Sequence, residues 1–241
     1  MPTTQGPLTA SLSHLCGLPL YKKETPYEIW AEDIDPTITK TNVKLEIVHD
    51  CVLHDVRLPS TDQPSLETHG FEWAHRPFPT ECGIKTANDV GFGDFVRCSK
   101  STHPRTEPNI YSPKGKEGNE LRATQIKHVW CPIVDVVESH LLVLCDIRTV
   151  EDSDWDVVEK VLDQCVEESM YLKRRQRHQW YWMSDQTKND SIVMNIWDSF
   201  YPDSRRYSAP HCSMVLRDRD IRPNARPRES IELRLLAWKE L

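Results

Sequence analysis

Short runs of apolar and β-branched residues, separated by polar and turn-forming residues, make up much of the chain after residue 40. Runs of this length and composition are typical of β-strands. The pattern predicts one or two strands over 44–53 and further strands over 125–133, 140–148, 178–184, 191–199, 211–217 and 229–238. Short strands joined by turns favour a mainly β fold, a β-sandwich or jelly roll closed by Greek-key connections.

One segment follows a helical period instead of a strand period. The apolar positions at helical spacing are Trp155, Val158, Leu162, Cys165 or Val166, and Met170. Asp152 or Ser153 would provide the N-cap of this helix. We therefore expect one long helix, over about 153–174, that packs against the strands.

The chain divides into three parts by composition. Residues 1–75 contain the first strands, and 76–124 are rich in proline, glycine, lysine, serine and threonine. Five prolines interrupt regular structure there, so the segment is expected to form long loops and a mobile lid. Residues 125–241 would form the core of the fold. A chain of 241 residues suits one domain, so we expect 1–241 to be a single unit.

The composition of the chain limits the kinds of partner that we expect. The chain has 38% hydrophobic and 28% charged residues, as a soluble protein does, and no apolar run of membrane-spanning length. Its net charge of −7 disfavours nucleic acid as the main partner. The first residues do not form a secretory signal, which favours a cytoplasmic location. The eight cysteines include no Cys-x-x-Cys pair, so a structural zinc site has no support. The size is compatible with a homodimer.

The last predicted strand is polar on one side. Because side chains alternate along a strand, Arg228, Ser230, Glu232 and Arg234 share one face, and three apolar residues share the other. Such a strand suits an edge that faces water, and it also suits the wall of a polar pocket. The sequence by itself slightly favours the first interpretation.

Many short segments, in order along nearly the whole chain, resemble those of one family. They are Thr25-Pro-Tyr27, Thr41-Asn42, Asp55-Val-Arg57, Ser65-Leu-Glu-Thr-His-Gly-Phe-Glu72, Val129-Trp-Cys-Pro-Ile133, Leu144-Cys-Asp-Ile-Arg148, Gln179-Trp-Tyr-Trp182, Trp197-Asp-Ser199, Pro210-His211 and Arg228-Glu-Ser-Ile-Glu-Leu-Arg234. With them the chain resembles the fungal CmcJ-like hydroxylase-desaturase family, which includes the aspergillic-acid hydroxylase. The resemblance implies a double-stranded β-helix that uses Fe(II) and 2-oxoglutarate to modify secondary metabolites.

The resemblance also implies roles for residues near the end of the chain. His211 matches the distal iron-binding histidine of the family. Arg228 and Ser230 match the Arg-x-Ser that holds the 2-oxoglutarate carboxylate, a contact that suits a planar guanidinium. The family also has an upstream His-Val-Asp that completes the two-histidine, one-carboxylate set.

That upstream pair has no counterpart in this chain. None of its ten histidines is followed two residues later by an acid, and the corresponding segment, 108–115, offers no ligand pair. In addition, Cys131 replaces the arginine of the family's Trp-Arg-Pro. We therefore expect no metal site and no cofactor.

The sequence thus predicts a metal-independent enzyme of secondary metabolism on an oxygenase-like scaffold. It would catalyse cyclisation, cycloaddition or isomerisation of a small molecule by positioning and hydrogen bonding. The candidate catalytic residues are His211, Arg228 and Asp198, and the candidate substrate-binding residues are Trp130, Tyr181, Trp182 and Ser230. Alternation puts Trp182 and Tyr181 on opposite faces, so at most one of them lines the pocket.

Other interpretations remain open. The alternative function is an Fe(II)- and 2-oxoglutarate-dependent hydroxylase or desaturase with unorthodox iron ligands. A third is a non-catalytic protein that binds a partner protein. For single residues, Asp198 either orients His211 or caps a turn, and the tryptophans either line the pocket or fill the core.

Overall fold

The computed structural model describes residues 8–32, 34–76, 121–198, 207–216 and 225–240. In these residues the strands are β1 (Thr9–Leu15), β2 (Tyr27–Ile29), β3 (Leu45–Asp55), β4 (Phe71–His75), β5 (Leu121–Pro132), β6 (Leu142–Cys145), β7 (Trp155–Val161), β8 (Val166–Leu172), β9 (Trp180–Trp182), β10 (Asp190–Asp198), β11 (His211–Ser213), β12 (Val215–Leu216) and β13 (Ser230–Glu240). The short 3-10 helices are η1 (Pro19–Lys22), η4 (Ile147–Thr149) and η5 (Asp152–Asp154). The predicted loop region 76–124 lies almost entirely outside the described residues.

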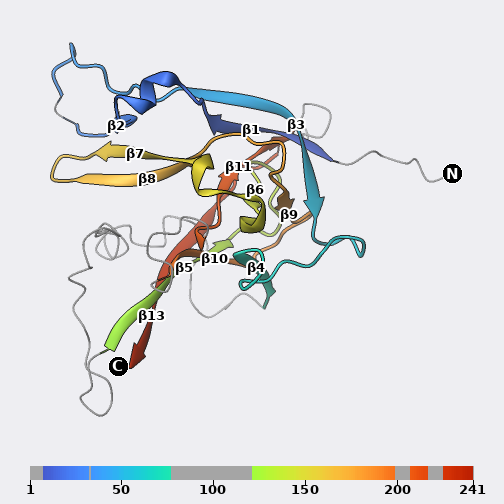
Figure 1. Cartoon of the computed structure of the whole chain (residues 1–241). Coiled ribbons are helices and arrows are strands. Elements are labelled where there is room, and N and C mark those ends of the chain that lie inside the picture. The colour runs from blue at the N-terminus through green and yellow to red at the C-terminus, as the bar shows by residue number, and fades with distance from the viewer. Residues whose placement is uncertain (1–7, 33, 77–120, 199–206, 217–224, 241) are drawn as a thin grey trace.

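The strands form three sheets (Figure 1). The largest has the order β11-β6-β9-β3-β1-β12, the second β13-β5-β10-β4, and the third β2-β7-β8. Only Met214 separates β11 from β12, although these strands stand at opposite ends of the first sheet. The first sheet therefore closes on itself through the chain. The mainly β, jelly-roll fold predicted from the sequence is confirmed.

The two larger sheets pack their inner faces together. Residues that pair across strands share a face, so His211, Leu144 and Tyr181 lie on one side of the first sheet. The Tyr181 ring lies 5.8 Å from the ring of Phe71 in β4, which identifies that side as the inner one. On the second sheet, Phe71 is in line with Met194 of β10, and both are buried. The core lies between these faces.

The prediction of a long helix over 153–174 is wrong, because this segment forms the hairpin β7–β8. Trp155 pairs with Leu172 and Val161 with Val166, and the Leu162 N–H closes the turn on the Cys165 carbonyl at 2.9 Å. Valine-rich runs favour strands, since branching at Cβ restricts these side chains in a helix. Of the apolar residues at helical spacing, only Trp155 and Val158 are buried, so the spacing does not mark a buried helical face. No helix in the described residues is long and apolar enough to cross a membrane.

Gly70, just before β4, has a backbone conformation and surroundings that any other residue could adopt only with strain. Its φ is 84°, and a Cβ built there would lie 2.7 Å from Ile147 Cγ2. Gly70→Ala is therefore expected to lower the free energy of unfolding by about 2 kcal/mol or more. Urea unfolding measures this loss. Gly17→Ala is the matched control, since its Cβ would meet only Lys173 Cδ at 4.0 Å; equal losses in the two variants would contradict the prediction.

Candidate active site

The polar face of β13 is turned toward the interior. In the register of β13 with β5, Glu232 pairs with Trp130 and Arg234 with His128. Trp130 and His128 are both buried in the core. Because paired residues share a face, Glu232 and Arg234 point the same way as these two side chains. The last strand is thus the wall of an internal polar region, the interpretation that the sequence favoured less.

His211 enters this region from β11 on the facing sheet. Its Nδ1–H donates to the Ala209 carbonyl at 2.9 Å, which leaves Nε2 with a free lone pair. The side chain is exposed to solvent, yet the protein around it desolvates the ring and lowers its pKa. A side chain with both properties lies in a recess that solvent can enter. A histidine fixed by a carbonyl bond at one nitrogen is suited to present the other to a ligand.

A hydrogen bond and an ion pair fix a carboxylate beside His211. Arg234 Nε donates to His128 Nε2 at 2.9 Å, so His128 carries its proton on Nδ1, and Nδ1 lies 2.5 Å from Glu232 Oε1. The bond from His128 lowers the pKa of Glu232, so the carboxylate is ionised. The charge on Glu232 raises the pKa of His211 and thereby opposes desolvation. Glu232 and His211 therefore act on each other electrostatically in one recess.

Arg228 covers the aromatic part of this region. Its guanidinium carbon lies 5.4 Å from the centre of the Trp130 ring, in cation–π contact. Nη1 donates to the His140 carbonyl at 2.5 Å, and burial lowers the pKa of the guanidinium. Ser230, two residues further along the same face, is half-buried and pairs with Pro132 of β5. Arg228, Ser230 and Trp130 thus lie together on the inner wall.

The other predicted site residues lie elsewhere. Asp198, at the end of β10, accepts a hydrogen bond from Gln125 Nε2 at 2.8 Å, whereas His211 bonds to Ala209. Tyr181 is on the inner face but buried in the core. Trp182 lies on the opposite face of β9 from Tyr181, as alternation predicted.

The sequence did not lead us to assign His128, Glu232 or Arg234 to the site. Alternation along β13 shows that Glu232 and Arg234 share a face with Ser230. The pairing of β13 with β5, which brings His128 between them, cannot be read from alternation. The site therefore depends on a cross-strand register that the sequence does not display.

Comparison with known proteins relates the chain to a family and to solved structures. Residues 100–238 match the family model described as oxidoreductase/YMDC permease-like domain. The iron and alpha-ketoglutarate-dependent endoperoxidase NvfI has 18% identical residues and a TM-score of 0.65, over 97% of this chain and 98% of that one. A structure of NvfI in a different conformation has 20% identical residues and a TM-score of 0.66, over 97% of this chain and 99% of that one. A variant of NvfI has 18% identical residues and a TM-score of 0.68, over 97% of this chain and 99% of that one. No curated protein matches the sequence.

These findings correct one expectation. The sequence predicted catalysis without a cofactor, but the solved structures that share the fold are those of an iron- and alpha-ketoglutarate-dependent enzyme. The expectation rested on one missing motif, the His-x-Asp pair. A motif reports ligands that are neighbours in sequence and does not report those that folding brings together.

Proposed function

Because the chain belongs to the oxidoreductase/YMDC permease-like domain family, we propose that it is an iron- and 2-oxoglutarate-dependent oxidoreductase that hydroxylates or desaturates a small organic molecule. The observation that supports this most is the placement of His211 opposite the polar face of β13, in a recess between the two sheets. The fold that it shares with NvfI is consistent with the proposal. A fungal CmcJ-like secondary-metabolite enzyme is the finer form of it.

The residues of the inner wall suit the recognition of a carboxylate. Arg228 offers five N–H donors in a planar fork, of which Nη1 is engaged by His140. Trp130 holds the guanidinium over its ring, so less conformational entropy is lost when a ligand binds. Ser230 adds a hydroxyl on the same face. In this proposal Arg228 and Ser230 bind the co-substrate carboxylate, and Trp130 positions Arg228.

The described residues do not complete an iron site. His211 suits one coordination position through Nε2. However, no group of three histidine, cysteine, aspartate or glutamate side chains in the described part of the chain could hold a metal ion. The sequence also lacks the His-x-Asp or His-x-Glu pair. We therefore assign only His211 to the metal and derive no reaction step through it.

The test is an anaerobic titration of the purified protein with Fe(II) and 2-oxoglutarate. When both are bound at one site, a metal-to-ligand charge-transfer band is expected in the visible spectrum. His211→Ala is expected to weaken Fe(II) binding by more than about tenfold and to abolish the band. His49→Ala, which replaces an exposed histidine on β3, is the control and should keep it.

Two outcomes would contradict the proposal. Native protein that gives no band and retains no iron after dialysis would remove the oxidoreductase assignment. Iron binding that His211→Ala leaves unchanged would remove His211 as a ligand while the function stands.

A further inference from the structure

A cavity separate from the recess at His211 lies beside β4, the edge strand of the second sheet. Its volume is about 390 Å³, within the range of about 300–1,000 Å³ that is typical of small-molecule sites. The residues that line it include three apolar side chains and three polar ones, namely Val56, Trp73 and Met183 with Arg57, His75 and Asp190. We call this cavity the Arg57 pocket.

Asp190 holds the polar side of the pocket together. Its side chain is 2% exposed, and Oδ1 accepts a hydrogen bond from His75 Nδ1–H at 2.7 Å. Oδ2 accepts from Arg57 Nη2 at 2.9 Å and from the N–H and hydroxyl of Thr187 at 2.9 and 2.8 Å. Burial by itself would raise the pKa of Asp190, but these bonds outweigh burial and lower it. Both carboxylate oxygens are engaged, so Asp190 orients Arg57 and His75.

Arg57 keeps donors for a ligand. Of its five side-chain N–H groups, Nε donates to the Ser184 carbonyl at 2.7 Å and one on Nη2 donates to Asp190. The other three, which include both on Nη1, have no acceptor among the residues that the structure describes. The side chain is 41% exposed. An arginine held at two points and open at the third is suited to a carboxylate, which it binds through two parallel hydrogen bonds.

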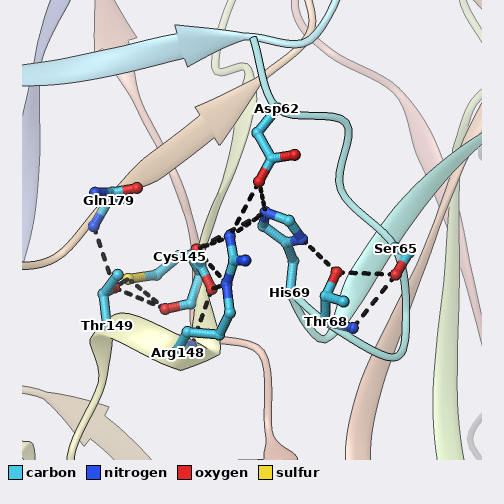
Figure 2. Close-up of polar contacts among 9 residues, drawn as sticks. Asp62, Ser65, Thr68, His69, Cys145, Arg148, Thr149 and Gln179 are labelled. Atoms are coloured by element: carbon cyan, nitrogen blue, oxygen red, sulfur yellow. Dashed lines mark hydrogen bonds and ion pairs between the residues drawn. The ribbon is translucent and has the colours of Figure 1, made fainter.

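The loop between β3 and β4 forms one wall of the pocket and is held in place. Gln63, which lines the pocket, donates from Nε2 to the Val56 carbonyl at 2.9 Å. Figure 2 shows Asp62 and His69 of this loop directed at Arg148 of η4. Arg148 Nη2 lies 3.3 Å from Asp62 Oδ2 and 2.6 Å from His69 Nε2. A wall that is fixed before the ligand arrives lowers the entropy cost of binding.

The pocket and the recess lie at opposite edges of the second sheet. Trp73 pairs with Ile192, Ile192 with Trp130, and Trp130 with Glu232, so these residues form one row across the inner face. Trp73 and Glu232 are three strand spacings apart, or about 14 Å. Ile192 and Trp130, which stand between them, are buried. A ligand at Arg57 is therefore distinct from one at Arg228.

We propose that the Arg57 pocket binds a small organic acid, with its carboxylate on the free N–H groups of Arg57 and its apolar part against Trp73 and Met183. The charges of Arg57 and Asp190 compensate each other, which favours a singly charged carboxylate over a more highly charged anion such as phosphate. Val56 extends the apolar side of the pocket.

The test uses benzoate as the probe and the native protein labelled with ¹³C at the methionine methyl groups. The chain has five methionines, of which Met183 lines the pocket, while Met194 and Met214 are buried in the core. Benzoate is expected to shift the NMR signal of Met183 and not those of the two core residues. Met183→Leu, which conserves volume, identifies the signal. Benzyl alcohol, with the same ring and no carboxylate, should bind at least about tenfold more weakly.

Arg57→Lys tests the role of the guanidinium. Lysine keeps a positive charge beside Asp190 but lacks the planar fork, so benzoate is expected to bind at least about tenfold more weakly. Arg174→Lys, which changes an exposed arginine outside the pocket, is the control and should leave the affinity unchanged.

A Met183 signal that benzoate leaves in place would overturn the proposal, and this result is also expected if benzoate binds only at Arg228. Equal affinity for benzyl alcohol, or Arg57→Lys that binds benzoate as tightly as the native protein, would overturn it as well. If Arg57→Lys does not fold, the comparison of the two probes on the native protein decides. None of these measurements uses iron, 2-oxoglutarate or turnover, so the outcome is independent of the proposed oxidoreductase activity.

Discussion

Asp154→Ala is expected to lower the free energy of unfolding by about 3 kcal/mol. The Asp154 carboxylate, at the end of η5, is fully buried. It accepts hydrogen bonds from the Glu151 N–H at 2.9 Å and from His178 Nε2 at 3.2 Å, and it forms ion pairs with Arg175, at 2.9 Å, and Arg177. Burial by itself would raise the pKa of Asp154, but these bonds outweigh burial and lower it. The carboxylate is therefore ionised and held by two hydrogen bonds and two ion pairs with arginines.

Loss of this carboxylate would release the segment that leads into β9. Arg175 and Arg177 are partly exposed and can be rehydrated, so the loss lies at the low end of that for breaking a buried ion pair. Urea unfolding at neutral pH measures it. Asp156→Asn is the matched control, because Asp156 has a half-buried pair with Lys173 at 3.2 Å and should cost less than about 1 kcal/mol. A loss in Asp154→Ala as small as in the control would refute the assignment.

Acid is expected to destabilise the protein between about pH 6.5 and pH 4. His14, buried in β1, has its pKa lowered from 6.5 to about 4, chiefly by desolvation and then by His178 and Arg174. Burial also lowers the pKa of His178. The unfolded chain thus binds protons in this range that the folded protein does not. Stability is therefore fully present above pH 6.5 and is lost as pH falls toward the folded pKa.

His14 alone accounts for about 3 kcal/mol of this loss, at 1.36 kcal/mol for each pKa unit. Urea unfolding at a series of pH values between 7.5 and 4.5 checks it. His14→Gln cannot take up the proton and is expected to flatten the profile over this range. His49→Gln, at an exposed position, should leave the profile unchanged. A His14→Gln profile as steep as that of the native protein would show that desolvation of His14 is not the cause.

The strands were predictable because alternation is a local property. The run over 191–199 became β10 (Asp190–Asp198), whose inner residues Ile192 and Met194 are buried. The helix prediction failed because only Trp155 and Val158, of the apolar residues at helical spacing, are buried, so that spacing does not reflect a buried face. Intrinsic preference, with four valines between residues 157 and 166, was the better indicator.

The site was predictable only where one strand carries several of its residues. Ser230, Glu232 and Arg234 could be placed together from β13 alone, and their common face follows from alternation. The contact of Glu232 with His128 joins residues 104 positions apart, through a pairing that no local pattern encodes. The same holds for the contacts of Arg148 with Asp62 and His69, which join residues 86 and 79 positions apart. The register of pairing between strands distant in sequence is thus the information that local sequence patterns do not contain.

The closure of the first sheet gives the chain an order of assembly. β12 follows the strand that holds His211, and it pairs with β1. This strand pair therefore joins some of the first described residues to some of the last. During synthesis β1 can pair with β3, but its other edge stays open until about 160 further residues have been made. Contacts so distant in sequence are slow to form. The recess that holds His211 is therefore among the last parts of the protein to be completed, and an unfinished chain would expose the free edge of β1 to other chains.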